Sequence, residues 1–164
     1  MLRVVTLNIH KGLSHFNRRM VIHDLRDGLA ALDPDVVFLQ EVQGLNQRFA
    51  LRFNTYPIEP QHEFLAGKKW QPVYGCNAVY DHGHHGNAIL SRWPILKTDV
   101  MKLPNGGSDE DRSVLYTLID APFGKVPFFT THLNWKLHHG HVRQLQVRAL
   151  ADEIARLCPV DGFP

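Results

Sequence analysis

Apolar residues near the start of the chain fall into two short runs, separated by a stretch with helical spacing. Residues 3–12 (RVVTLNIHKG) and residues 35–41 (DVVFLQE) each hold an almost continuous apolar run, typical of a strand packed on both faces. Between them, residues 17–32 place apolar side chains at steps of three and four, with Asn17 as a candidate N-cap and Asp33-Pro34 as a stop. The pattern predicts a strand–helix–strand unit.

The rest of the chain shows hairpin-like strands and a closing helix. After a short helix or irregular turn and a surface excursion, apolar runs between turn residues predict strands, and the last apolar pattern predicts a helix with one apolar face. The turn covers residues 43–54, the excursion 56–72, the strands 73–80, 86–91, 95–103, 113–120 and 125–131, and the helix 140–157. This order favours a mixed sheet in a layered α+β domain.

The composition is typical of one folded unit, and it excludes few classes of binding partner. The chain has 164 residues, 44% of them hydrophobic and 21% charged, which is enough for a real core. The formal net charge is +2, so only local patches could bind a polyanion. Cys76 and Cys158 are too few for a disulfide framework and lack metal-ligand spacing. With no leader-like start and no apolar run near the ~20 residues that span a bilayer, we expect a cytoplasmic protein.

Two polar side chains end the predicted N-terminal strands. Asn8 lies at the carboxyl end of the first strand and Glu41 at that of the second, so a parallel crossover would bring both to the same rim of a sheet. A carboxylate and an amide oxygen suit a hard divalent cation such as Mg²⁺. The residues alone leave other interpretations open, because Glu41 could cap a helix or form a surface ion pair and Asn8 could form a turn.

Four sequence words resemble a known family. TLNIHKG (6–12), LQEV (39–42), HHGNAILSRWPI (84–95) and TTHL (130–133), in that order, resemble the endonuclease/exonuclease/phosphatase superfamily, and in particular its small cytoplasmic bacterial members. The resemblance implies a DNase I-like four-layer αββα sandwich of two mixed sheets flanked by helices. The family's later Gly-Asp-Phe-Asn and Ser-Asp-His words are absent. We therefore expect residues 1–164 to be the N-terminal part of a single domain of this family.

The resemblance also implies roles for individual residues. Glu41 stands at the family's magnesium-ligand word, and Asn8 becomes the second contributor to the metal site, directly or through water. His132, in the Thr-His-Leu word, would stand beside the scissile phosphate, where as an imidazolium it could stabilise transition-state charge or assist the leaving group. Asn87 would point its amide into the active-site groove. From the residues alone, a lone histidine after a strand is more often a hydrogen-bonded structural residue.

Three further residues are weaker candidates. His10 and Lys11 follow Asn8 and could contact phosphate, although exposure to solvent explains them nearly as well. Arg112 could clamp a phosphate bidentately, or it could pair with Asp109 or Asp111; the sequence favours neither.

Two histidine-rich stretches also leave a choice. Residues 81–87 (DHGHHGN) fit no zinc template, and a flexible surface turn explains them better than a metal site. Residues 134–151 contain Lys136, Arg143 and Arg148 but no acidic residue. This basic strip could guide a phosphate-bearing substrate, or it could be the solvated face of the last helix.

Together these patterns predict an Mg²⁺- or Mn²⁺-dependent phosphoesterase whose isolated chain is inactive, because the family's water-activating groups lie in the missing C-terminal part. One alternative is a non-catalytic module on the same fold that binds nucleic acid or phospholipid headgroups. Another is a half-domain that self-associates through an exposed sheet edge. The substrate is a phosphate ester of unspecified kind, because such a site recognises the phosphate rather than the group attached to it.

Overall fold

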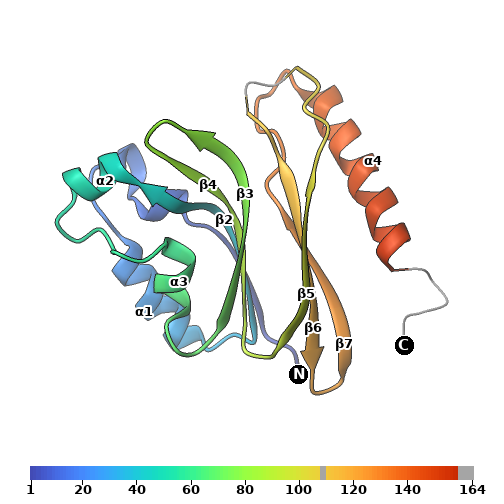
Figure 1. Cartoon of the computed structure of the whole chain (residues 1–164), viewed down its shortest axis with the longest axis horizontal. Helices are drawn as coiled ribbons and strands as arrows, with labels where there is room; N and C mark the ends of the chain where they lie inside the picture. Colours follow the sequence, from blue (N-terminus) through green and yellow to red (C-terminus); the bar gives the residue numbers. More distant parts are fainter. Residues whose placement is uncertain (108–109, 159–164) are drawn as a thin grey trace.

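Two β-sheets face each other in the centre of the molecule, and helices cover their outer faces (Figure 1). A computed structural model describes residues 1–107 and 110–158. The first sheet has the order β1 (Val4–Asn8), β2 (Val36–Asn46), β4 (Gly83–Ser91) and β3 (Gln71–Tyr80); the second has the order β5 (Ile95–Lys102), β6 (Ser113–Ala121) and β7 (Gly124–Thr131). Helices α1 (Ile22–Leu32), α2 (Gln47–Arg52) and α3 (Gln61–Ala66) lie outside the first sheet, and α4 (Gly140–Leu157) outside the second. The predicted α+β layering is confirmed.

The predicted strand–helix–strand unit is present. β1 pairs with β2 in parallel, from Val4 opposite Val36 to Asn8 opposite Gln40. The predicted helix start is wrong, because α1 begins only at Ile22 and Asn17 lies in a short 3-10 turn with a φ of 53° rather than at an N-cap.

The middle of the chain is more regular than the sequence patterns predict. β2 runs on to Asn46, whose side chain accepts a hydrogen bond from the backbone of Phe49 and so caps α2. The excursion at residues 56–72 contains α3. Residues 81–87 are no flexible turn, because all but the first two lie in β4. His85 is therefore held in a sheet, at 4% exposure.

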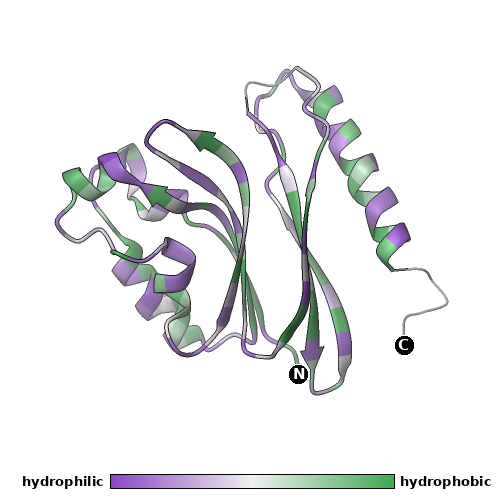
Figure 2. Cartoon of the chain, in the orientation of Figure 1, coloured by the Kyte–Doolittle hydropathy of each residue, from purple (hydrophilic) through white to green (hydrophobic). Residues whose placement is uncertain are grey.

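The core lies on both sides of the first sheet. Val36, Ile89, Leu115 and Ile119 are fully buried and form one apolar cluster of residues from both sheets. A larger cluster joins the outer face of the first sheet to α1 and α3. Figure 2 shows the apolar residues gathered in the central strands, whereas α4 alternates between apolar and polar residues along its length. The two sheets therefore form a rigid base for the strand ends above them.

The last helix packs less completely than its pattern predicts. Val142 and Gln146 are buried, but Leu145 and Ile154 of the predicted apolar face are 43% and 38% exposed. Among the described residues, no helix is both long and apolar enough to cross a membrane.

Candidate functional site

Polar side chains from both sheets meet above the line where the sheets face each other. Asn8 ends β1, Glu41 lies within β2, Arg112 directly precedes β6 and His132 directly follows β7. β6 and β7 are antiparallel neighbours with Val114 opposite Thr131, so Arg112 and His132 lie at the same end of this hairpin. The predicted meeting of Asn8 and Glu41 at one rim is confirmed by their contact.

A β-bulge sets the direction of the Glu41 side chain. In the pairing of β2 with β4, Leu39 lies opposite Ala88 and Val42 opposite Gly86, so two residues of β2 face the single residue Asn87. Glu41 takes a φ of 55°, a left-handed conformation that is uncommon for a residue with a long side chain. Bulges often redirect a side chain next to a functional site. The bulge thus turns a carboxylate out of a strand that is otherwise apolar.

Asn8 holds this carboxylate in place. Its Nδ2 donates to Oε1 of Glu41 at 2.9 Å, and its Oδ1 accepts from the backbone N–H of His10 at 2.9 Å. The amide oxygen therefore faces the loop after β1, and the amide nitrogen faces Glu41. In this arrangement Asn8 orients Glu41.

His132 lies between a carboxylate and a guanidinium. Its Nδ1 is 3.9 Å from Oε1 of Glu41 and accepts a hydrogen bond from Nη1 of Arg112 at 3.3 Å. Burial and the nearby Arg112 cation lower the pKa of His132, while Glu41 opposes this shift. The arrangement favours a neutral imidazole with its proton on Nε2. It does not favour the imidazolium that the sequence analysis expects.

Glu110 is the residue that sequence reasoning missed. Its carboxylate accepts hydrogen bonds from Nη2 of Arg112 at 2.8 Å and from Tyr80 Oη at 3.1 Å, and it lies 2.7 Å from Nε2 of His85. The His85 hydrogen bond, helped by the Arg112 charge, lowers the pKa of Glu110 to about 2. This carboxylate is therefore ionised at neutral pH and fixes Arg112, which is only 4% exposed.

The pairing of Arg112 with Asp111 does not form. Asp111 instead accepts a hydrogen bond from Asn105 at 2.9 Å and lies 3.5 Å from Lys102. Asp109 lies outside the described residues. The acidic turn signalled a partner for Arg112, but sequence could not show which of its carboxylates faces inward.

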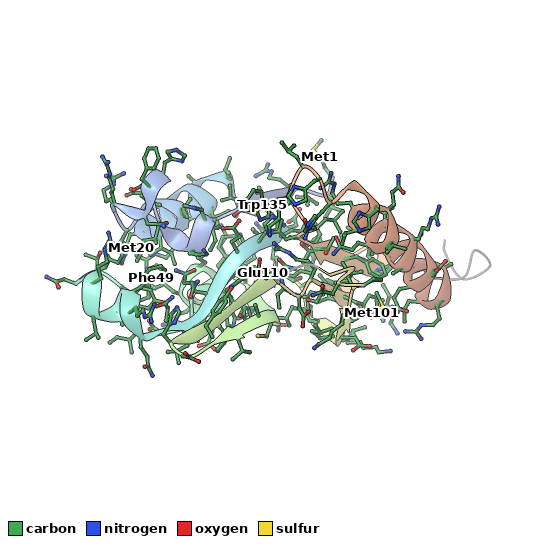
Figure 3. All side chains as sticks on the ribbon, turned by 90° about the horizontal axis from the view of Figure 1, so that it is seen from above. Met1, Met20, Phe49, Met101, Glu110 and Trp135 are labelled. Atoms are coloured by element: carbon green, nitrogen blue, oxygen red, sulfur yellow. The ribbon has the colours of Figure 1, made fainter. Side chains whose placement is uncertain are left out.

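These groups surround one small cavity of about 120 Å³. It is lined by Lys11, Glu41, His85, Glu110, Arg112, His132 and Trp135. Figure 3 shows Glu110 and Trp135 over the middle of the molecule, between the half with the first sheet and the half with α4. A wider cavity of about 680 Å³ shares Lys11 and Glu110 with it. The small cavity is lined by side chains of both charges, Lys11 and Arg112 beside Glu41 and Glu110.

Asn87 and His10, which are predicted to contact the substrate, make hydrogen bonds within the protein instead. Asn87 is fully buried, and its Nδ2 donates to the carbonyl of Ser113 at 3.4 Å. The ring of His10 donates from Nδ1 to the carbonyl of Leu13 at 3.3 Å, so it faces its own loop. Lys11, with a φ of 61°, lines the cavity instead. Substrate contacts by Asn87 and His10 remain predictions.

The donor set fits a hard cation held mainly by water and one carboxylate. Glu41 offers carboxylate oxygens at a side chain that is 21% exposed. Mg²⁺ usually keeps several waters and binds one or two carboxylates. Within residues 1–107 and 110–158, no three side chains of His, Cys, Asp or Glu gather closely enough to hold a metal by themselves. Glu41 is thus the residue that would anchor Mg²⁺ or Mn²⁺, with Asn8 fixing its orientation.

Comparisons with known proteins bear on the family and the fold. The model of the Endonuclease/Exonuclease/phosphatase family matches residues 5–159. The chain is 41% identical to YbhP of Escherichia coli K12 over 99% of its own length, and it spans 63% of the length of that relative. An endonuclease/exonuclease/phosphatase from Beutenbergia cavernae superposes with a TM-score of 0.73 at 24% identity, over 92% of this chain and 43% of that one. The human Nocturnin catalytic domain, with a bound sulfate anion, gives 0.70 at 16% identity, over 95% and 58%.

The match to the family model covers nearly the whole chain, and the fold agrees with it. The protein therefore belongs to the endonuclease/exonuclease/phosphatase family. Its two facing sheets with outer helices are the DNase I-like arrangement that the sequence resemblance implies.

Proposed function

We propose that this chain carries the metal- and phosphate-binding part of an Mg²⁺- or Mn²⁺-dependent phosphoesterase. The observation that carries the proposal is the convergence of Glu41, His132 and Arg112 on one small cavity from elements far apart in the sequence. Family membership supports phosphoester chemistry. The sulfate bound to the Nocturnin domain, a protein of the same fold, supports a site for a tetrahedral anion.

Each residue has a separate task in this proposal. Asn8 holds Glu41 so that one carboxylate oxygen remains available. Arg112 donates to Nδ1 of His132, which leaves the Nε2 proton of His132 to donate to a non-bridging phosphoryl oxygen. Glu110 keeps Arg112 fixed and partly neutralised. When bound, the divalent cation would polarise the phosphoryl group and neutralise the leaving oxygen.

We further propose that the isolated chain is inactive, because the attacking water needs a general base. Among the described residues, the carboxylates that line the cavity are already paired and so are not free to act as that base. The test is Mg²⁺-dependent hydrolysis of bis-p-nitrophenyl phosphate by this chain and by the chain extended through its reading frame. We expect turnover only in the extended protein. Turnover by the 164-residue chain would disprove the inactivity.

The same assay tests the roles of individual residues in the extended protein. His132→Gln and Glu41→Gln should each lower kcat by about 100-fold or more, the range for loss of a positioned catalytic group. His138→Gln and Glu59→Gln are matched controls, because both side chains are exposed outside the cavity, and they should retain activity. Equal activity in all four variants would contradict the proposed site.

A second candidate function is a binding module that does not turn over its ligand. The observation that favours it is that charged groups of the site are already paired, Glu41 with Asn8 and Arg112 with Glu110. In that case the protein should bind single-stranded DNA or anionic vesicles with a strong salt dependence that Glu41→Gln does not change. Metal-dependent hydrolysis that depends on Glu41 would exclude this alternative.

A further inference from the structure

An exposed tryptophan stands at the mouth of the candidate site. Trp135 is 70% exposed, yet it lines the same small cavity as Glu41 and His132. Figure 3 shows Trp135 over the middle of the molecule. A large aromatic ring in water forgoes the stabilisation that burial would give it. Packing in the core therefore does not explain the position of Trp135.

The other two tryptophans, unlike Trp135, make packing contacts with the core. Trp70 is 5% exposed, and its indole N–H donates to the carbonyl of Pro34 at 3.0 Å. Trp93 packs against the core between the sheets and makes an edge-to-face contact with Phe123. Within the described part of the chain, the ring of Trp135 has no such ring contact or hydrogen bond. Its indole faces are thus left open beside the cavity.

The backbone that carries Trp135 is fixed on both sides by α4. Arg143 donates from Nη1 to the carbonyls of Asn134 and Lys136, at 3.3 Å and 2.6 Å. The side chain of Gln146 accepts from the backbone N–H of Asn134 at 3.0 Å. The guanidinium of Arg143 therefore stabilises the turn at residues 134–136, so this residue of the basic strip has a structural role. A ring on a fixed turn loses little conformational entropy when it binds a ligand.

Trp135 lines the cavity of about 120 Å³ in which the phosphate is proposed to bind. A group attached to that phosphate can therefore lie over the indole ring, or it can enter the wider cavity of about 680 Å³ that shares Lys11 and Glu110 with the small one. Stacking on indole is open to any planar aromatic ring, and the glycerol or inositol of a lipid headgroup offers none.

We propose that Trp135 is a stacking subsite for a planar aromatic ring carried by the phosphate ester, as in a nucleotide or an aryl ester. The inference rests on the proposed phosphate site and adds the class of substrate to it. The subsite distinguishes esters with an aromatic ring from esters of lipid headgroups. Lys11, which lines the same cavity, adds a cation near the phosphate.

The test is an NMR titration of the 164-residue chain with Mg²⁺ present, followed through its tryptophan indole N–H signals. The ligands are 5′-AMP, ribose 5-phosphate, phenyl phosphate and glycerol 3-phosphate. The Trp135 signal should move with 5′-AMP and phenyl phosphate, while that of buried Trp70 stays in place. Because stacking contributes about 1–3 kcal/mol per base, 5′-AMP should bind at least about fivefold more tightly than ribose 5-phosphate. Tighter binding of 5′-AMP would indicate a nucleotide as the substrate, and tighter binding of phenyl phosphate would indicate an aryl ester.

Variants separate this inference from the proposed function. Trp135→Leu should reduce the affinity for 5′-AMP to that for ribose 5-phosphate, and Trp135→Tyr should restore most of the difference. Phe16→Leu, a change at another exposed aromatic residue, should alter neither affinity. Equal affinities of the unchanged chain for 5′-AMP and ribose 5-phosphate would overturn the stacking subsite and leave the phosphate site intact. Absence of binding by every phosphate ester would overturn both.

Discussion

At the scale of single residues, the candidate site is a series of paired charges rather than a set of free ligands. Glu41 is bound by Asn8, and Arg112 joins Glu110 to His132. Sequence could indicate Glu41 because it follows an apolar run, and it could indicate His132 through the Thr-His-Leu word of the family resemblance. It could not indicate Glu110, because its role depends on side chains from distant strands that meet only in the folded chain.

Arg112 should control the protonation of His132. Arg112→Gln removes a cation that lowers the pKa of His132 and leaves Glu41 and Glu110, which raise it, so the pKa of His132 should rise toward its ordinary value. Arg112→Lys should keep it low, because it retains the charge. Proton NMR titration of the histidine Cε1–H signals measures this, with His132→Gln assigning the resonance. An unchanged pKa in Arg112→Gln would show that burial alone sets it.

Glu110 should make the folded chain sensitive to acid. Its pKa is lowered to about 2 from the ordinary 4.5, so its ionised form stabilises the fold above about pH 4.5, and this contribution is lost as the pH falls toward 2. Glu110→Gln should lower the free energy of unfolding at pH 7 by about 2 kcal/mol, because it leaves the buried Arg112 without its counterion. Urea denaturation between pH 7 and pH 3 measures both effects.

Asp111→Asn is the matched control for Glu110, since it removes a neighbouring carboxylate whose side chain is 48% exposed. It should change the stability at pH 7 much less than Glu110→Gln does. If Glu110→Gln kept the full acid dependence of the unchanged chain, the assignment of that dependence to Glu110 would be wrong.

At the scale of elements, the sequence predicts the strands and helices better than their ends. Each apolar run does form a strand, because a run of this kind can be buried only between two layers. The continuation of β2 to Asn46 and the late start of α1 at Ile22 depend on tertiary packing. The bulge at Glu41 has no signal in a hydrophobic pattern, although it decides where the candidate metal ligand points.

Close contact between β3 and β4 should make Gly86 difficult to replace. A Cβ at Gly86 would overlap the backbone carbonyl of Gly75, and backbone cannot move as a flexible side chain can. Gly86→Ala should therefore destabilise the chain by about 3 kcal/mol. Gly28→Ala, at an exposed helical position with open space, should instead stabilise it by about 0.5–1 kcal/mol. Thermal unfolding compares the two, and similar effects would contradict the close approach.

At the scale of the whole molecule, the four layers follow from the family resemblance, whereas periodicity alone predicts only a layered α+β domain. Resemblance also places the two sheets face to face, which the structure confirms. The assignment of residues 1–164 to one part of a single domain and the cytoplasmic location stay predictions.

Self-association through a sheet edge is also still a prediction. β1 pairs only with β2 in the described part of the chain, and Val4 in it is 43% exposed. If this edge drives association, sedimentation velocity should show a mass that rises with concentration, and Val4→Lys should suppress the rise. A single monomeric species at all concentrations would exclude it.

We propose that Glu41 anchors a divalent cation at the rim of the first sheet. Electron paramagnetic resonance of Mn²⁺ titrated with the 164-residue chain tests it without requiring turnover. We predict that the free-Mn²⁺ signal decreases as the chain is added, that Glu41→Gln weakens binding by about tenfold or more, and that Asn8→Ala weakens it less. Glu59→Gln should bind as the unchanged chain does. Equal Mn²⁺ binding by the unchanged chain and by Glu41→Gln would show that Glu41 does not anchor the cation.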